Sequence, residues 1–274
     1  MDAEPFGDGR YRAPAHGTCE RNVVEGGQQL GAVVVAAAKE VPELRVTSVA
    51  LACSRAARHD LPLDLELEVL RRGRTQSTLQ VRLLQDGTFC SAGTIHMDAG
   101  SVDLIRDSAS MPPVTGPEAL ADLDLPGFEV AGRQIRVVDN AYDWDPAHVG
   151  APELFVWERF DEPGATAAMD AALLAHSTTH WTIAAALRPH AGYTEIDAHR
   201  RFSSAISMVT VAFHEPVDSS QWVLYANRAI HAGNGTVQGE GRIHDATGTV
   251  VASYSVNAMV RPLIRTGTDS GRLM

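Results

Sequence analysis

The stretch Met169–Leu187, MDAALLAHSTTHWTIAAAL, decides how the rest of this chain is interpreted. It is rich in Ala and Leu, contains neither Gly nor Pro, and carries apolar residues on helical faces over about five turns. This pattern predicts a buried helix. A polar island, His176–His180 (HSTTH), lies in its middle. A buried helix that carries a polar island is a candidate binding or catalytic site.

A second segment of the same kind, Gly26–Lys39, comes early in the chain. Its small apolar residues predict a slim helix from about Gln28 to Glu40, and Pro42 follows as a stop signal. Gly31 would allow another backbone to approach closely. Each helical segment is followed by alternating segments, so the chain looks like one fold written twice.

Segments in which apolar and polar residues alternate predict an antiparallel meander with one solvated face after each helix. The Asp86-Gly87 pair is a strong hairpin signal, and Asp245–Gly248 repeats it at an offset of about 160 residues. The expected strands are Val46–Cys53, Leu63–Leu70, Ser77–Leu83 and Phe89–Met97, then Gln134–Val138, Leu154–Phe160, Ile206–Phe213, Trp222–Ile230, Thr236–Ile243 and Val250–Val260.

These patterns favour an α+β fold made of two tandem units, each a helix wrapped by a curved antiparallel sheet. Residues 1–25 are expected to form an extended lead-in with at most one short strand. Residues 99–126 lose the alternation and contain several prolines. We therefore expect an N-terminal unit at 1–110, a linker at 111–126 and a C-terminal unit at 127–274.

Bulk properties exclude several classes of partner. The 274 residues carry a net charge of −11, which argues against nucleic acid and anionic membranes. No apolar run reaches the ~18 residues that would cross a bilayer. The N-terminus is polar and acidic, unlike a signal peptide, so a cytoplasmic location is expected. Cys19, Cys53 and Cys90 have no CxxC spacing, which favours buried free thiols over disulfides or a zinc site.

The polar island allows several interpretations. His176 and His180 have the i, i+4 spacing of metal ligands, but Ser177 stands where the HExxH motif has Glu, and no third ligand is evident. We therefore expect no metal and no cofactor. Either histidine could be a general base, or both could simply line a cavity. Thr178 and Thr179 could hold a carbonyl or a water, or bond back to the helix backbone.

Seven segments, distributed over both halves of the chain, resemble segments of the acyl-CoA thioesterase II (TesB-like) family and follow in the same order. They are Val24–Gly31, Ala36–Pro42, Leu67–Arg74, Pro152–Trp157, Ala212–Pro216, Trp222–Tyr225 and Val250–Ser253. The resemblance implies a double hotdog fold and hydrolysis of an acyl-CoA or acyl-carrier thioester. It also implies that the helix of Met169–Leu187 is the second hotdog helix.

The resemblance further implies a water held by an Asp on that helix, a Thr or Ser on the next strand and a Gln on the last strand. The Asp position falls at Thr179, and the strand position at Ile206 or, with a one-residue slip, Ser207. The Gln position falls at Val256, beside Asn257. The family's general base is therefore replaced in this chain, and loss of a general base alone costs ~10²–10⁴ in rate. We expect a thioesterase with a non-standard site.

Candidate site residues follow from the island and the resemblance. Those with a catalytic role are Thr179, His180, His176 and Ser207, and those that bind substrate are Gly27, Gln28, Thr178, Val256 and Asn257. The Gly26-Gly27 pair is not a phosphate loop. It is either a helix-start turn or a source of backbone N–H groups aimed at the thioester carbonyl.

Two other functions stay open. One is a hotdog enzyme of changed chemistry, a dehydratase, isomerase or cyclase acting on an acyl or polyketide substrate, because the water-binding set is replaced while both histidines are present. The other is a non-catalytic acyl-binding protein. The expected partner is an acyl-CoA or an acyl-carrier-protein-bound acyl group. A homodimer or larger homo-oligomer is expected by analogy with other hotdog proteins.

Overall fold

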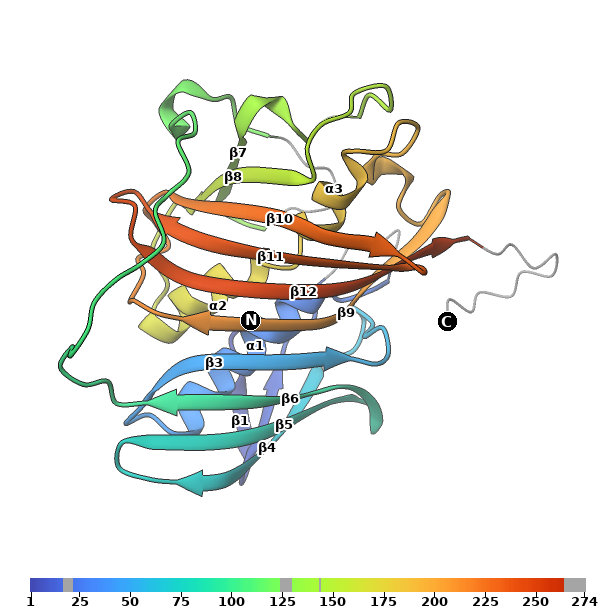
Figure 1. Ribbon diagram of the computed structural model, residues 1–274. Helices are drawn as coiled ribbons and strands as arrows, with labels where there is room; N and C mark the ends of the chain where they lie inside the picture. The colour runs from blue at the N-terminus through green and yellow to red at the C-terminus, as the bar shows by residue number, and fades with distance from the viewer. Residues whose placement is uncertain (17–21, 124–129, 143, 264–274) are drawn as a thin grey trace, which may run out of the picture.

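A computed structural model describes residues 1–16, 22–123, 130–142 and 144–263. Within these described residues, twelve strands form one sheet in which every neighbouring pair is antiparallel, and the helices lie against its concave face (Figure 1). The strand order across the sheet is β1-β2-β4-β5-β6-β3-β9-β12-β11-β10-β8-β7. This architecture confirms the predicted α+β double hotdog.

The elements of the first unit are β1 (Glu4–Gly7), β2 (Arg10–Ala13), α1 (Gly26–Glu40), β3 (Arg45–Cys53), β4 (Leu63–Arg72), β5 (Gln76–Gln85) and β6 (Thr88–Asp98). The second half contains η1 (Pro117–Ala119), β7 (Arg133–Val137), η2 (Val138–Asn140), β8 (Glu153–Phe160), α2 (Ala167–Ser177), α3 (Trp181–Leu187), η3 (Glu195–Asp197), β9 (Phe202–Phe213), β10 (Val223–Gly233), β11 (Thr236–Asp245) and β12 (Val250–Pro262). Each predicted strand corresponds to one of these, with ends shifted by up to four residues.

The two units join through β3 and β9, which pair antiparallel from Ser48 opposite Ala212 to Ala52 opposite Met208. The join makes one continuous sheet of the strands of both units. The predicted unit boundaries at 1–110 and 127–274 stay a prediction.

Local chemistry explains the hairpins and the buried faces. Asp86 and Gly87 have φ of 47° and 71°, and Asn234 and Gly235 have φ of 54° and 73°. Two successive positive φ angles define the tight turn that suits twisted antiparallel strands. Along β4, the alternating leucines are buried under α1 while the acidic residues between them face outward.

The lead-in before α1 differs from the expectation. The described part of residues 1–25 contains two strands, and β1 and β2 form a hairpin that extends the sheet beside β4. Arg12 pairs with Asp64 across this edge, Nε to Oδ1 2.7 Å apart. A cross-strand charge pair fixes the register of such an edge. The alternation in residues 4–13 is too short to have been distinguished from an extended loop.

The predicted helix at Met169–Leu187 is interrupted. It starts earlier, at Ala167, after Thr166 has capped it by accepting a hydrogen bond from the Met169 amide. It stops at Ser177, and α3 begins at Trp181. Composition predicted helical structure on both sides of the break but not the break itself, and the predicted start was two residues late.

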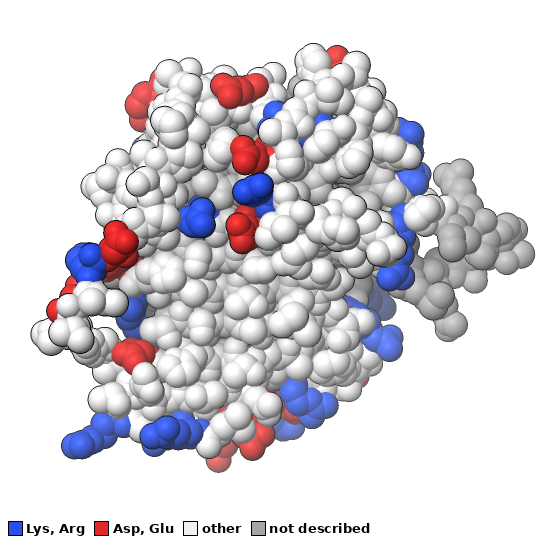
Figure 2. All heavy atoms as spheres, viewed as in Figure 1, with Lys and Arg blue, Asp and Glu red and all other residues white. Residues whose placement is uncertain are grey.

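Cys90 is buried and Cys53 is partly buried, and both are free thiols, while Cys19 lies outside the described residues. No helix among residues 1–16, 22–123, 130–142 and 144–263 combines the length and apolarity needed to cross a membrane. On the face shown in Figure 2, few charged side chains of the described residues lie over the middle of the sheet, and both signs occur around it.

Candidate active site

The site lies where α1 and α2 cross, because glycines allow the two helices to approach closely. A Cβ atom on Gly27 would lie 1.9 Å from the carbonyl oxygen of His176, and one on Gly31 would lie 3.1 Å from that of Ala172. The two contacts run in opposite directions along the two chains, so the helices are antiparallel. The N-terminus of α1 therefore meets the C-terminus of α2.

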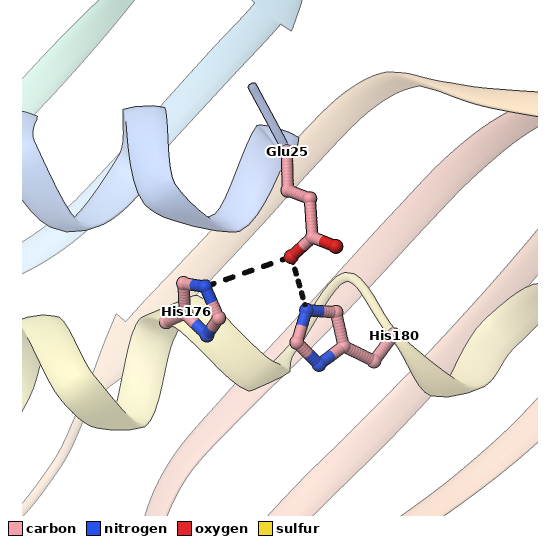
Figure 3. Close-up of side chains that lie close together, drawn as sticks. All are labelled: Glu25, His176 and His180. Atoms are coloured by element: carbon pink, nitrogen blue, oxygen red, sulfur yellow. Dashed lines mark hydrogen bonds and ion pairs between the residues drawn. The ribbon is translucent and has the colours of Figure 1, made fainter. Parts of the chain in front are cut away.

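Three titratable side chains meet at this crossing (Figure 3). Glu25 precedes the first residue of α1, and its Oε2 lies 2.9 Å from Nε2 of His180 and 3.6 Å from Nε2 of His176. The imidazole rings stand edge to face, with centroids 4.8 Å apart. The histidine side chains are 7% and 4% exposed, whereas Glu25 is 31% exposed. The carboxylate is thus the group of the three that solvent or a substrate can reach.

Arg133, the first residue of β7, contacts the other nitrogen of His180. Its Nη1 lies 3.2 Å from Nδ1 of His180 and 3.2 Å from Oγ of Ser177. A guanidinium donates hydrogen bonds and accepts none, so Nδ1 is the acceptor. The proton of neutral His180 then sits on Nε2 and is donated to Glu25.

A buried acid completes the polar cluster. Ser177 ends α2 and is fully buried, and its hydroxyl donates to Oε1 of Glu158 at 2.6 Å. Glu158 is 1% exposed, and its Oε2 has no hydrogen-bond partner among the described residues. Burial raises the pKa of Glu158, although Arg133 and Ser177 oppose the shift.

The two groups beside His180 respond differently to burial. Burial tends to raise the pKa of Glu25, but the interactions with His180, His176 and Arg133 outweigh it and lower that pKa to about 2. The positive end of the α1 dipole acts in the same direction. Burial lowers the pKa of His176 well below its ordinary value, and the neighbouring His180 lowers it further. At neutral pH the site holds an ionised carboxylate beside a neutral His176.

The threonines of the island bond back to the helix. The Thr178 hydroxyl donates to the carbonyl of Ala175 at 2.7 Å, and that of Thr179 donates to the carbonyl of His176 at 3.3 Å. The Thr178 and His180 amides donate three residues back rather than four. These tighter bonds end α2 at Ser177 and explain the break before α3.

The predicted substrate-binding and strand residues are dispersed. Gln28 accepts a bond from the amide of His16, and Val256 is a buried residue opposite Val209. Asn257 donates to Gln238. Ser207 is the extra residue of a bulge in β9. Of the nine candidates, His176, His180, Thr179 and Gly27 lie at the helix crossing.

Sequence reasoning missed the three charged residues of the cluster. Glu25 stands in the segment Val24–Gly31 without a predicted role, and Arg133 lies one position outside the strand expected at Gln134–Val138. Glu158 was placed on a strand, but a single acid in a strand reads as solvent-facing. An acid directly before a glycine pair at a helix start was the one usable signal, because a helix N-terminus favours a carboxylate.

The third group also bears on metal binding. Glu25, His176 and His180 offer donor atoms within 4.8 Å of one another, so the expectation that the histidines lack a third partner was wrong. The partner was missed because it lies 155 residues from His180. However, a ligand nitrogen needs a free lone pair, and with Arg133 at Nδ1 the Nε2 of His180 carries its proton. This donor set does not fit a metal, and no step is derived through one.

Comparisons with known proteins bear on this arrangement. The family model described as the acyl-CoA thioesterase N-terminal domain matches residues 14–97, and that described as the C-terminal domain matches residues 107–260. No curated protein matches the chain.

Solved structures share the whole fold. The tesB protein of Mycobacterium avium subsp. paratuberculosis superposes with a TM-score of 0.78 at 20% identity, covering 95% of this chain and 96% of that one. Acyl-CoA thioesterase II TesB2 from Mycobacterium marinum gives 0.77 at 19% identity, covering 96% of each. A hot dog fold protein from Alicyclobacillus acidocaldarius gives 0.75 at 17% identity, covering 95% and 96%. With both of its halves matched by the family models, the chain belongs to the acyl-CoA thioesterase family.

Proposed function

We propose that this protein hydrolyses an acyl-CoA thioester at the crossing of α1 and α2, with the carboxylate of Glu25 as the general base. The observation that carries the proposal is the Glu25–His180 hydrogen bond of 2.9 Å at the N-terminus of α1. The family resemblance implies a carboxylate on the second hotdog helix, where this chain has Thr179. Here the first helix supplies the carboxylate instead, from the opposite side of the same crossing.

The chemistry requires one water and no other co-reactant. Glu25 orients the water and accepts one of its protons while the water oxygen attacks the thioester carbonyl carbon. The tetrahedral intermediate then expels the CoA thiolate as the C–S bond breaks. The proton returns from Glu25 to the thiolate, so the products are a carboxylic acid and free CoA.

The protonation state of Glu25 suits part of this task. A pKa of about 2 keeps the carboxylate in its accepting form throughout the neutral range. It also makes Glu25 an intrinsically weak base, so catalysis must depend on the position of the water. An acyl group that covers the exposed third of Glu25 would exclude solvent and raise its proton affinity.

Backbone donors at the same helix end can stabilise the intermediate. The first N–H groups of a helix lack partners within that helix, and Gly26 and Gly27 occupy these positions in α1. Donors aimed at a developing oxyanion provide a large part of acyl-transfer catalysis. The glycine pair thus serves two purposes in this proposal: close helix approach and N–H groups for the carbonyl oxygen.

A second candidate is dehydration or isomerisation of the acyl chain. The observation that favours it is a neutral His176 beside a protonated Nε2 of His180, because such reactions need one base and one acid on opposite sides of a carbon. The ionised Glu25 does not serve as the acid. The two functions differ in product, since hydrolysis frees a thiol and dehydration leaves the thioester intact.

The test is incubation of the purified protein with acyl-CoAs of several chain lengths, including β-hydroxyacyl-CoAs, with thiol release and product mass both recorded. Hydrolysis predicts stoichiometric CoA and free acid, with turnover strongly reduced in His180→Ala. Loss of water with CoA still attached would support the second candidate instead. If an acyl-CoA binds but no product forms from any substrate, the protein is a non-catalytic acyl-binding protein.

Three finer points belong to the same proposal. The acyl carrier is CoA, with acyl carrier protein as the other source of the same thioester. The protein works in the cytoplasm, in fatty-acid or polyketide metabolism, as a homo-oligomer. The net charge of −11 supports a small-molecule partner over nucleic acid.

A further inference from the structure

Arg133, Ser177 and Glu158 form a buried chain of hydrogen bonds that ends on the candidate catalytic histidine. The chain runs from Glu158 through Ser177 and Arg133 to Nδ1 of His180. Ser177 is 0% exposed to solvent, and Glu158 is 1% exposed. None of these three residues takes part in the hydrolytic step proposed above.

Arg133 fixes the direction of the two bonds that it makes in this series. A guanidinium has donors only, so Arg133 donates both to Oγ of Ser177 and to Nδ1 of His180. Ser177 has its lone pairs toward Arg133 and its proton toward Oε1 of Glu158, 2.6 Å away. If Glu158 is protonated, it donates to Oγ of Ser177 instead, and the two bonds from Arg133 keep their directions.

We propose that Arg133 is a positioning residue that holds His180 in the tautomer with its proton on Nε2, and that Ser177 and Glu158 hold Arg133 in place. This inference rests on the proposed role of Glu25 as the base. In the other tautomer, N–H groups of Arg133 and His180 would face each other at 3.2 Å, and a bare nitrogen lone pair would face the Glu25 carboxylate at 2.9 Å. Both contacts would become repulsive in a buried site.

The consequence for catalysis passes through His180 to Glu25. With Nε2 protonated, Oε2 of Glu25 accepts a hydrogen bond from His180 and is held at the end of α1. Oε1 is then the oxygen left to orient a water. Without Arg133, His180 can take either tautomer, Glu25 loses its fixed donor, and the base moves relative to the substrate.

The first test is the tautomer itself, measured by long-range ¹H–¹⁵N NMR of the imidazole nitrogens at neutral pH. The signals of His180 are those that His180→Ala removes from the set of 11 histidines. The wild type should show a protonated Nε2 and an unprotonated Nδ1. A wild-type His180 with its proton on Nδ1 would overturn the inference whether or not any variant folds.

Variants test the cause of that tautomer. Arg133→Met keeps the side-chain length and removes the donor, so the His180 signals should shift to a mixture of tautomers or to the Nδ1–H form. Arg133→Lys restores a donor and should recover the wild-type signals. Arg136→Met is the matched control on the same strand, because Arg136 binds Asp122 and stacks on Trp222. Unchanged signals in Arg133→Met would contradict the inference.

Kinetics separate positioning from substrate binding. Arg133→Met should lower kcat at least about tenfold with KM changed less than about threefold, and Arg133→Lys should recover most of the loss. An equal loss in Arg136→Met would point to a structural effect. If the wild type proves inactive on thioesters, the NMR test still decides the tautomer. If the wild type is active and the tautomer does not depend on Arg133, this inference alone fails.

Discussion

The two hotdog helices of this chain occupy equivalent places and have opposite characters. Helix α1 is an unbroken 15-residue helix whose buried face is almost entirely small and apolar. Helices α2 and α3 occupy the corresponding place in the second unit, broken between Ser177 and Trp181, and bury His176, Ser177, Thr178 and Thr179 around that break. The first helix contributes one carboxylate, the second contributes both histidines, and β7 and β8 add Arg133 and Glu158. The site exists only where the two units meet.

The largest expected effect comes from separating the two helices. Gly27→Ala places a methyl 1.9 Å from the His176 carbonyl oxygen, which is backbone and cannot yield without moving α2. We expect a loss of at least about 3 kcal/mol in the free energy of unfolding, or no folded protein. Urea denaturation measures this change.

Gly26→Ala is the matched control for that substitution. Its Cβ would meet the Ile206 side chain at 3.4 Å, an ordinary contact. We expect a change within about 1 kcal/mol. Equal losses in both variants would mean that the close crossing of α1 and α2 is not what fixes the site.

The two acids of the cluster should affect stability in opposite directions. The pKa of Glu25 is lowered in the folded protein, so it stabilises the fold above the ordinary value of 4.5, and that contribution is lost as pH falls toward about 2. Glu25→Gln should therefore cost on the order of 1–3 kcal/mol at neutral pH and much less in acid. The pKa of Glu158 is raised, so its contribution is lost as pH rises above 4.5.

Unfolding free energies of Glu25→Gln and Glu158→Gln across a pH series test this contrast. The loss of unfolding free energy in Glu25→Gln should become smaller as pH falls. The unfolding free energy of Glu158→Gln should increase relative to that of the wild type as pH rises. Parallel curves for the two variants would contradict the assigned environments of the two carboxyl groups.

His176 should give a smaller, separate pH effect. Its pKa is lowered by burial, so the folded protein keeps it neutral while the unfolded chain protonates it below the ordinary value of 6.5. The wild type should lose about 1 kcal/mol or more of stability between about pH 6.5 and pH 5. His176→Phe should flatten this part of the curve, whereas the exposed His148 replaced by Phe should leave it unchanged.

The smallest effect is expected at the position where the resemblance puts the family's catalytic acid. The Thr179 hydroxyl is bonded to the carbonyl of His176, so it does not need to hold the water. Thr179→Val should change kcat by less than about threefold. Thr178→Val serves as the companion variant. A hundredfold loss of kcat in Thr179→Val, but not in Thr178→Val, would show that the Thr179 hydroxyl takes part in catalysis.

Sequence patterns predicted the fold far better than the site. Alternation along β4 and β5 and the Asp86-Gly87 turn are local or periodic signals, and the structure confirms them. The break after Ser177 depends on threonine hydroxyls that can bond either way, so composition could not decide it. Glu25 and Arg133 reach the histidines through tertiary contacts across 155 and 47 residues. A pattern within one segment carries no record of such partners.

The most direct test of the account compares the two glutamates at the ends of α1. Glu25 binds His180 at one end, and Glu40 accepts a hydrogen bond from Tyr11 at the other, 2.9 Å away. The measurement is kcat/KM for CoA release from the preferred acyl-CoA in Glu25→Gln and Glu40→Gln. We expect a loss of ~10²–10⁴ for Glu25→Gln and a change of less than about threefold for Glu40→Gln. Full activity in a folded Glu25→Gln would rule out Glu25 as the base.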